Sequence, residues 1–141
     1  MNDPIYKAAI KLERLITLDQ LFLKKCKRGE LDMIKKMVKI FDININAIDR
    51  RKCSPLIIAC RKGYTDIVQF LLQQPLINIK LRDENGFSAL ECAIWMNRVK
   101  IVDLLLKTDK FDINEKIPYG IFKNTSPYSI SILRGNKELI F

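Results

Sequence analysis

Histidine is absent from all 141 residues of the chain. Without an imidazole there can be no Ser-His or Cys-His nucleophilic pair, no imidazole general base and no zinc site that depends on histidine. The four cysteines, Cys26, Cys53, Cys60 and Cys92, contain no Cys-x-x-Cys pair, which disfavours an all-cysteine zinc site. A phosphate-binding loop, a Gly-x-Gly-x-x-Gly motif and a Gly-x-Ser-x-Gly motif are also missing. We therefore expect a protein that is not an enzyme, with no catalytic residues, no metal and no cofactor.

Long hydrophobic runs are missing as well. No apolar segment approaches the roughly 18 residues that a membrane-spanning helix needs. Met1 is followed by Asn2 and Asp3 rather than by the basic and apolar stretches of a secretory signal. The scattered cysteines are typical of small core residues in a reducing compartment. We expect no membrane insertion and an intracellular, by default cytoplasmic, location, which would be a host cell if the source is a virus or an intracellular bacterium.

The charge is unbalanced, with 25 Lys and Arg against 16 Asp and Glu and a formal net charge of +9. A basic protein attracts acidic proteins or nucleic acid. The sequence contains no helix-turn-helix, zinc-finger, RNA-recognition or K-homology signature, and its aromatic residues are not interleaved with basic ones. Specific nucleic-acid binding is therefore not expected, whereas nonspecific phosphate contact through a basic face stays open.

A period of 34 residues organises the chain. Residues 54–63 (SPLIIACRKG) are repeated as residues 88–97 (SALECAIWMN), and the same frame places Gly29 in an earlier copy. A further copy, residues 126–135 (SPYSISILRG), follows with an offset of 38 residues. Four similar units are therefore predicted.

Each unit predicts two short antiparallel helices. Ser54 stands where a helix needs an N-cap oxygen, and Pro55 stands at the first helical position, where its missing N–H costs nothing. Gly63, or Asn97 in the next unit, tolerates a positive φ and ends the first helix. A second helix follows with apolar residues at helical spacing. Two helices of this length cannot bury their apolar faces alone, so the units must stack into a continuous core.

These units resemble ankyrin repeats, whose pattern is a D-x-x-G-x-T turn, a T-P-L-H-x-A-A-x-x-G first helix and an I-V-x-L-L-L second helix. The resemblance covers roughly residues 19–141 and implies an all-α fold, an α-solenoid of helix-turn-helix repeats with β-hairpin-like finger loops. The matching residues in two units are Asp49, Ser54, Pro55, Leu56, Ala59, Gly63, Ile67, Val68, Leu71 and Leu72, and then Asp83, Gly86, Ser88, Leu90, Ala93, Ile101, Val102, Leu104, Leu105 and Leu106.

Departures from the family pattern are also informative. Ile57, Glu91 and Ser129 replace the family's histidine, so stability must come from packing. Lys52 stands where the turn prefers glycine, which predicts a strained finger at a cost of about 1 kcal/mol. Four extra residues enlarge the finger at 116–125 and make it partly apolar.

The expected organisation is a capping helix at 1–18, ankyrin-like repeats at 19–48, 49–82 and 83–115, and an incomplete repeat at 116–141. Apolar residues on one face of 4–17 predict the amphipathic cap. The sequence stops midway through the expected second helix of the last repeat, where a solenoid should present a polar cap. We favour the amino-terminal part of a longer ankyrin protein over an end that another chain covers. A monomer is expected.

The resemblance implies that finger tips and the outer residues of the first helices bind partners on a concave face. Basic residues are concentrated there in the first two repeats, and the second carries seven basic and two acidic residues. The acids Asp83, Glu84 and Glu91 lie at positions that a turn or solvent explains. The predicted partner-binding residues are Lys27, Arg28, Arg50, Arg51, Cys53, Arg61, Lys62, Glu84, Asn85, Phe87, Trp95, Met96, Thr125, Leu133 and Arg134.

Two interpretations of these residues stay open. The basic cluster either steers an acidic partner or only keeps the surface soluble. Trp95, with Met96 and Phe87, either anchors an apolar side chain of a partner or packs under the enlarged finger with Tyr119 and Phe122. The predicted function is a non-catalytic protein-protein interaction module that binds an acidic and apolar segment. The alternative is a structural spacer, or a fragment of a larger ankyrin protein whose activity lies beyond residue 141.

Overall fold

The computed structural model describes residues 3–5, 7 and 16–139. Most of the expected capping helix, 4–17, lies outside these residues. Within them the chain forms helices and no strands, apart from one isolated antiparallel bridge between Arg82 and Ser88, so the all-α expectation is confirmed. The helices with defined bounds are α2 (Leu18–Arg28), α3 (Leu31–Ile40), α4 (Pro55–Lys62), α5 (Thr65–Leu72), α6 (Ala89–Trp95), α7 (Val99–Leu106) and α8 (Pro127–Arg134).

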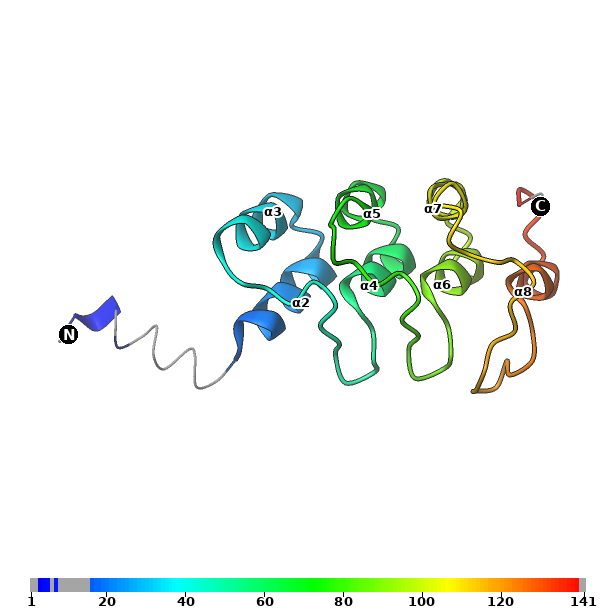
Figure 1. Cartoon of the computed structure of the whole chain (residues 1–141), viewed down its shortest axis with the longest axis horizontal. Helices are drawn as coiled ribbons and strands as arrows, with labels where there is room; N and C mark the ends of the chain where they lie inside the picture. The colour runs from blue at the N-terminus through cyan, green and yellow to red at the C-terminus, as the bar shows by residue number, and fades with distance from the viewer. Residues whose placement is uncertain (1–2, 6, 8–15, 140–141) are drawn as a thin grey trace.

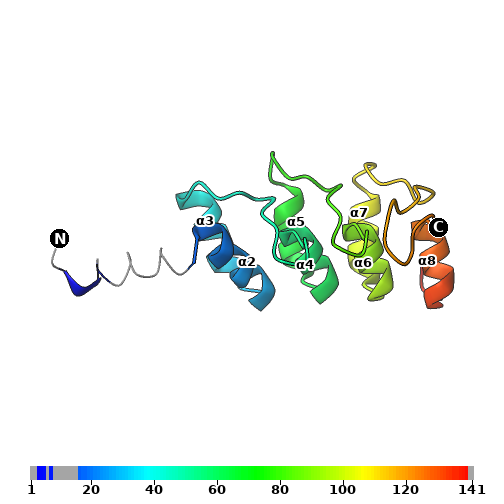
Figure 2. The same ribbon diagram turned by 90° about the horizontal axis from the view of Figure 1, so that it is seen from below.

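The helices form two rows, as Figure 1 shows. The inner row contains α2, α4, α6 and α8, and the outer row contains α3, α5 and α7. Long loops extend from the inner row on the side away from the outer row, and both views show the helix pairs following one another along one axis (Figures 1 and 2). We call these loops finger 2 (49–53), finger 3 (83–87) and finger 4 (116–125). The arrangement is a solenoid.

The helix ends follow the predicted signals. The Ser54 hydroxyl accepts a hydrogen bond from the backbone N–H of Ile57 at 3.3 Å, Pro55 occupies the first turn of α4, and Gly63 ends the helix with φ 78°. Asn97 takes the glycine position after α6 with φ 56°. These left-handed residues reverse the chain between the inner and outer helices.

Finger 2 contains the strained residue that the sequence predicts. Lys52 has φ 62°, which is unfavourable for a side chain with a Cβ. The carboxylate of Asp49 holds this turn, because its Oδ1 accepts the N–H groups of Arg51 and Cys53, each at 2.9 Å. The finger is therefore shaped by one partly buried acid rather than by a glycine.

One hydrophobic core runs through the stack. The inner helices pack in the order α2, α4, α6, α8, and each of α2, α4 and α6 also packs on its own outer helix. Leu56, Ile67, Leu90 and Leu105 are fully buried between these layers. Stacking thus buries the apolar faces that one helix pair leaves exposed, as expected.

Polar links also join neighbouring units at the bend between inner and outer helices. The hydroxyl of Tyr64 donates to the carbonyl of Lys27 at 3.2 Å, and the Nη2 of Arg98 donates to the carbonyl of Arg61 at 3.2 Å. From α8, the Nε of Arg134 donates to the carbonyl of Trp95 at 2.7 Å. Each link caps the last turn of an inner helix with a side chain of the following unit.

Candidate partner-binding surface

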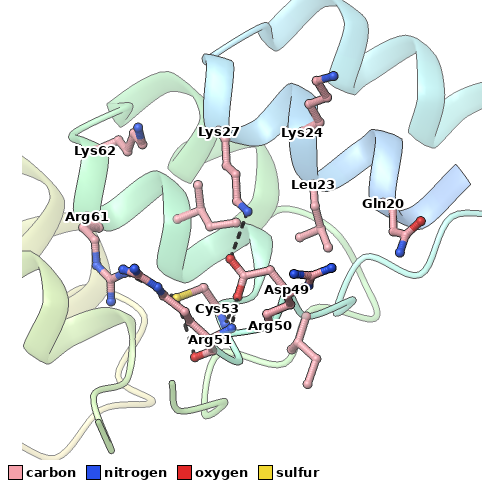
Figure 3. A pocket seen from close by; sticks show the side chains of 12 residues that line it. Gln20, Leu23, Lys24, Lys27, Asp49, Arg50, Arg51, Cys53, Arg61 and Lys62 are labelled. Atoms are coloured by element: carbon pink, nitrogen blue, oxygen red, sulfur yellow. Dashed lines mark hydrogen bonds and ion pairs between the residues drawn. The ribbon is translucent and has the colours of Figure 1, made fainter. Parts of the chain in front are cut away.

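A wide hollow of about 760 Å³ lies between α2, α4 and finger 2. We call it the basic groove, and Figure 3 shows the side chains that line it. Leu23 and Ile58 give it a partly apolar floor. Its lining residues are Gln20, Leu23, Lys24, Lys27, Ile48, Asp49, Arg50, Arg51, Cys53, Ile58, Arg61 and Lys62.

Six of these side chains are cationic and one is acidic. Lys27 is paired with Asp49 at 3.1 Å, as the dashed line in Figure 3 marks. Arg61 is paired with Asp83. Among the described residues the other four cations of the groove make no ion pair. These uncommitted cations are Lys24, Arg50, Arg51 and Lys62.

The one acid of the basic groove stays ionised to low pH. Burial raises the pKa of the Asp49 carboxyl, but the N–H groups of Cys53 and Arg51 and the ammonium of Lys27 together outweigh burial and lower that pKa below its ordinary value of 3.8. Asp49 therefore offsets Lys27 at neutral pH, and the remaining positive charge of the basic groove belongs to uncommitted side chains.

A second hollow of about 390 Å³ adjoins the first, because Arg51 and Arg61 line both. We call it the aromatic hollow. The ring of Trp95 lies 5.1 Å from the ring of Phe122 and 6.0 Å from that of Phe87, measured between centroids. Such tilted ring pairs hold one another in place. The hollow is lined by Arg51, Arg61, Asp83, Glu84, Asn85, Phe87, Cys92, Trp95, Met96, Ile121 and Phe122.

Two acids near this hollow are buried, so a solvent position does not explain them, although Asp83 does stand in the turn of finger 3 as expected. Asp83 is 1% exposed and its Oδ2 lies 2.6 Å from the Nη2 of Arg61. Glu91 is also 1% exposed and pairs with Arg82 at 2.9 Å. Buried carboxylates need such partners to offset their desolvation. Of the three acids, only Glu84 is exposed.

Burial disfavours the thiolate form of the four cysteines. All four cysteines are buried and unpaired. Burial raises the pKa of Cys26 to about 12, and it raises the pKa values of Cys53, Cys60 and Cys92 above their ordinary value of 9.0. A thiol in this state lacks the thiolate that covalent chemistry or metal binding requires.

The comparison with known families agrees with this architecture. The family model described as ankyrin repeats matches residues 22–117 in three copies, which is more than half of the chain. The chain belongs to the ankyrin repeat family.

Several curated relatives share the repeats. The BTB/POZ domain-containing protein 3 of Schizosaccharomyces pombe is 31% identical over 117 residues, which are 82% of this chain and 21% of that protein. The putative ankyrin repeat protein L86 of Acanthamoeba polyphaga mimivirus is 39% identical over 91 residues, covering 60% of this chain and 16% of that protein. Mouse Rabankyrin-5 is 29% identical over 69 residues, which are 49% of this chain and 6% of that protein. The chain thus spans about a fifth or less of the relatives it matches.

The ankyrin frame brings most of the predicted site residues to the two hollows. Lys27, Arg50, Arg51, Arg61 and Lys62 line the basic groove. The aromatic hollow collects most of the rest, namely Glu84, Asn85, Phe87, Trp95 and Met96. These ten residues therefore line two adjoining hollows over three repeats.

Two predicted contact residues are buried and offer a partner little accessible surface. Cys53 is 1% exposed, because its N–H is held by Asp49 and its sulfur lies 3.4 Å from the guanidinium of Arg61. Phe87 is 7% exposed, because the Trp95 and Phe122 rings cover it. Both form the floor of a hollow rather than its rim.

Four other predicted residues lie outside both hollows. Arg28 is exposed on α2 and Leu133 is exposed on α8. The Thr125 hydroxyl donates to the carbonyl of Phe122, which stabilises finger 4 from within. Arg134 lies with its guanidinium carbon 5.3 Å from the centre of the Trp95 ring.

The two interpretations of Trp95 each describe part of its environment. Its ring packs against Phe122 of finger 4, but it remains partly exposed and lines the aromatic hollow. Tyr119, the other aromatic residue named for this finger, donates its hydroxyl to the carbonyl of Asp83 at 2.8 Å.

Some lining residues were not predicted. Lys24 lies one helical turn before Lys27, and this spacing could have identified it. Ile48 and Ile121 also line the hollows. Ile121 lies in the enlarged finger 4, so no repeat position assigns it. In the described ranges no helix is long and apolar enough to span a membrane, and no cluster of metal-ligating side chains occurs.

Proposed function

We propose that this ankyrin stack is a non-catalytic protein-recognition module that binds an acidic segment of a partner in the basic groove and one apolar side chain of that partner in the aromatic hollow. The observation that carries the proposal is the set of four cations around one groove that no acid of the described chain neutralises. Uncommitted cations on a fixed scaffold attract acidic partners and speed their association.

Family membership supports the general role. Ankyrin repeats generally mediate protein-protein interaction and are typically non-catalytic. The high thiol pKa values and the absence of histidine support the non-catalytic part for this chain. Four unpaired cysteines are consistent with the reducing interior of a cell, where we place the protein.

The aromatic hollow supplies the apolar contact. Trp95 is partly exposed, Met96 is exposed, and both line the hollow next to Arg51. Tryptophan and methionine are enriched in interface cores, and truncating such an anchor typically costs about 2 kcal/mol of binding free energy. Because Arg51 lines both hollows, one extended segment can contact both.

The alternative is a spacer, or one part of a longer ankyrin protein whose activity lies elsewhere. The specific observation that favours it is that the chain spans about a fifth or less of its curated relatives. In that case the basic groove would only solubilise the surface, and its contacts with polyanions would be nonspecific.

The experiment measures fluorescence anisotropy of a labelled peptide that carries five acidic residues and one phenylalanine. The protein is tested at 50 and 150 mM salt, with duplex DNA as a second probe. We expect Arg50→Glu with Arg51→Glu to weaken peptide binding by at least about tenfold. The matched control, Lys36→Glu with Lys39→Glu, makes the same charge change on exposed positions of α3 and should leave binding nearly unchanged.

A second variant tests the apolar contact. Trp95→Ala should weaken binding of the phenylalanine peptide and have little effect on a peptide in which alanine replaces the phenylalanine. The spacer interpretation would be favoured if the groove variant and the control variant lost peptide affinity equally. It would also be favoured if duplex DNA bound as tightly as the peptide and both were released at 150 mM salt.

A further inference from the structure

The two hollows differ in the charged side chains that no ion pair of the described residues neutralises. The charged residues that line the aromatic hollow are Arg51, Arg61, Asp83 and Glu84. Arg61 and Asp83 neutralise each other at 2.6 Å, which leaves Arg51 on the side shared with the basic groove, and Glu84. Along the solenoid the surface therefore changes from four free cations to one free carboxylate.

Glu84 is held in a defined place at the tip of finger 3. Its backbone N–H donates to the carbonyl of Arg51 at 2.9 Å, which ties it to finger 2. The Oδ1 of Asp83 accepts the N–H groups of Asn85 and Phe87 at 2.9 and 3.0 Å. The carbonyl of Asp83 accepts the hydroxyl of Tyr119 from finger 4. Both residues that flank Glu84 are thus fixed by hydrogen bonds.

No cation of the described residues is paired with the Glu84 carboxylate. Arg82 is committed to Glu91 at 2.9 Å and to Glu115 at 3.7 Å. Arg134 donates to the carbonyl of Trp95 and lies over its ring. Glu84 is exposed, and it lines the same hollow as the apolar anchor residues.

Finger 4 adds an apolar wall to that hollow. Ile121 is 88% exposed yet lines the hollow together with Trp95 and Met96. The backbone of Gly120 lies against that of Asn85, so finger 4 approaches finger 3 closely. An apolar side chain that enters the hollow would contact Ile121 as well as Trp95, and it would lie near Glu84.

We propose, on the basis of the function proposed above, that Glu84 selects the charge of the partner residue next to the apolar anchor, so that the recognised segment is acidic in the basic groove, then basic beside Glu84, then apolar in the direction from finger 2 to finger 4. An acidic residue beside the anchor would meet the Glu84 carboxylate, and like charges at an interface are unfavourable. Uniformly acidic chains are therefore bound less well than segments whose charge changes sign.

The test uses four labelled peptides measured by anisotropy at 50 mM salt. Each has five acidic residues, then a lysine or glutamate, then a phenylalanine, and each is made in both chain directions because the charge order does not fix the direction. For one direction, wild type should bind the lysine peptide about two- to fivefold more tightly than the glutamate peptide, the range of an exposed ion pair. Glu84→Gln should bring that ratio close to one, and Glu84→Lys should invert it.

The control variant is Asp32→Lys, which makes the same charge change at an exposed position of the outer helix α3 and should keep the wild-type ratio. A wild-type ratio near one in both directions, or a ratio that Glu84→Gln does not change, overturns the role of Glu84. If those peptides still bind and Arg50→Glu with Arg51→Glu still weakens them, the proposed function stands. Loss of this groove dependence overturns both proposals.

Discussion

The guanidinium of Arg61 lies 2.6 Å from the carboxylate of Asp83 and joins the inner helix of one repeat to the finger of the next. Asp83 also accepts backbone N–H groups from Asn85 and Phe87, so one buried side chain positions finger 3 and neutralises a cation of the basic groove. Arg61 is therefore a structural residue of the site and not one of its free charges.

We expect Asp83→Ala to lower the free energy of unfolding by about 3 kcal/mol or more, because it leaves the Arg61 charge and two backbone N–H groups without their acceptor. Asp103→Ala is the control, since Asp103 forms an exposed pair with Lys107 at 2.8 Å. That variant should change stability by less than about 0.5 kcal/mol. Urea unfolding followed by circular dichroism measures both, and similar values for the two would contradict this role of Asp83.

The pKa of Asp49 predicts a specific acid sensitivity. The folded-state pKa lies below 3.8, so between these two values the unfolded chain binds the proton and the folded chain does not. The stabilisation from Asp49 is therefore complete above pH 3.8 and is lost as the pH falls through the lowered folded-state pKa. Asp49→Asn keeps an oxygen acceptor for the finger but cannot titrate. The stability difference between wild type and this variant should shrink below pH 3.8, and a constant difference from pH 7 to pH 2.5 would argue against it.

Lys52 offers a stabilising substitution. Lys52→Gly removes the cost of φ 62° and should raise the free energy of unfolding by about 0.5–1 kcal/mol after the entropic cost of glycine. Lys123→Gly is the matched control, because Lys123 is exposed on finger 4 and is not among the positive-φ residues. It should be neutral or destabilising. Thermal melts of the two variants give the comparison. If Lys52→Gly leaves the melting temperature unchanged or lowers it, the backbone at Lys52 is not strained.

Substitutions at two glycines distinguish the cost of backbone strain from the cost of a steric clash. Gly120 and Gly135 both have positive φ, at 87° and 70°. A Cβ at Gly120 would collide with the Asn85 carbonyl, whereas one at Gly135 meets nothing within 4 Å. We expect Gly135→Ala to cost about 1 kcal/mol and Gly120→Ala about 2 kcal/mol or more.

The fluorescence of the only tryptophan provides a second readout of Gly120→Ala. Moving finger 4 should withdraw Phe122 from Trp95 and shift the emission to longer wavelength, while Gly135→Ala should not. An unshifted spectrum in a destabilised Gly120→Ala variant would show that Phe122 stays against Trp95 even when the close approach of Gly120 to Asn85 is lost.

The sequence predicted the elements that recur with the period. The Ser54 cap, the Gly63 and Asn97 reversals and the strained Lys52 each follow from a residue type at a repeat position. The groove cations were largely predicted for the same reason.

The missed features depend on pairs that are distant in sequence. The sequence does not show that Asp83 is paired with Arg61, which is 22 residues away, or that Glu91 is paired with Arg82. Nor does it show that Phe122 of the enlarged finger lies against Phe87. A single sequence without this geometry does not show which polar residues are paired and which are free.

The side-chain links from Tyr64 to Lys27, from Arg98 to Arg61 and from Arg134 to Trp95 each cross one junction between repeats. Because each repeat of a solenoid contacts only its neighbours, bending of the stack is expected at these junctions. A ligand that lies across the first two fingers would clamp one junction and leave the others free. Binding should therefore reduce the elastic flexing of the solenoid locally, at the junction that it spans.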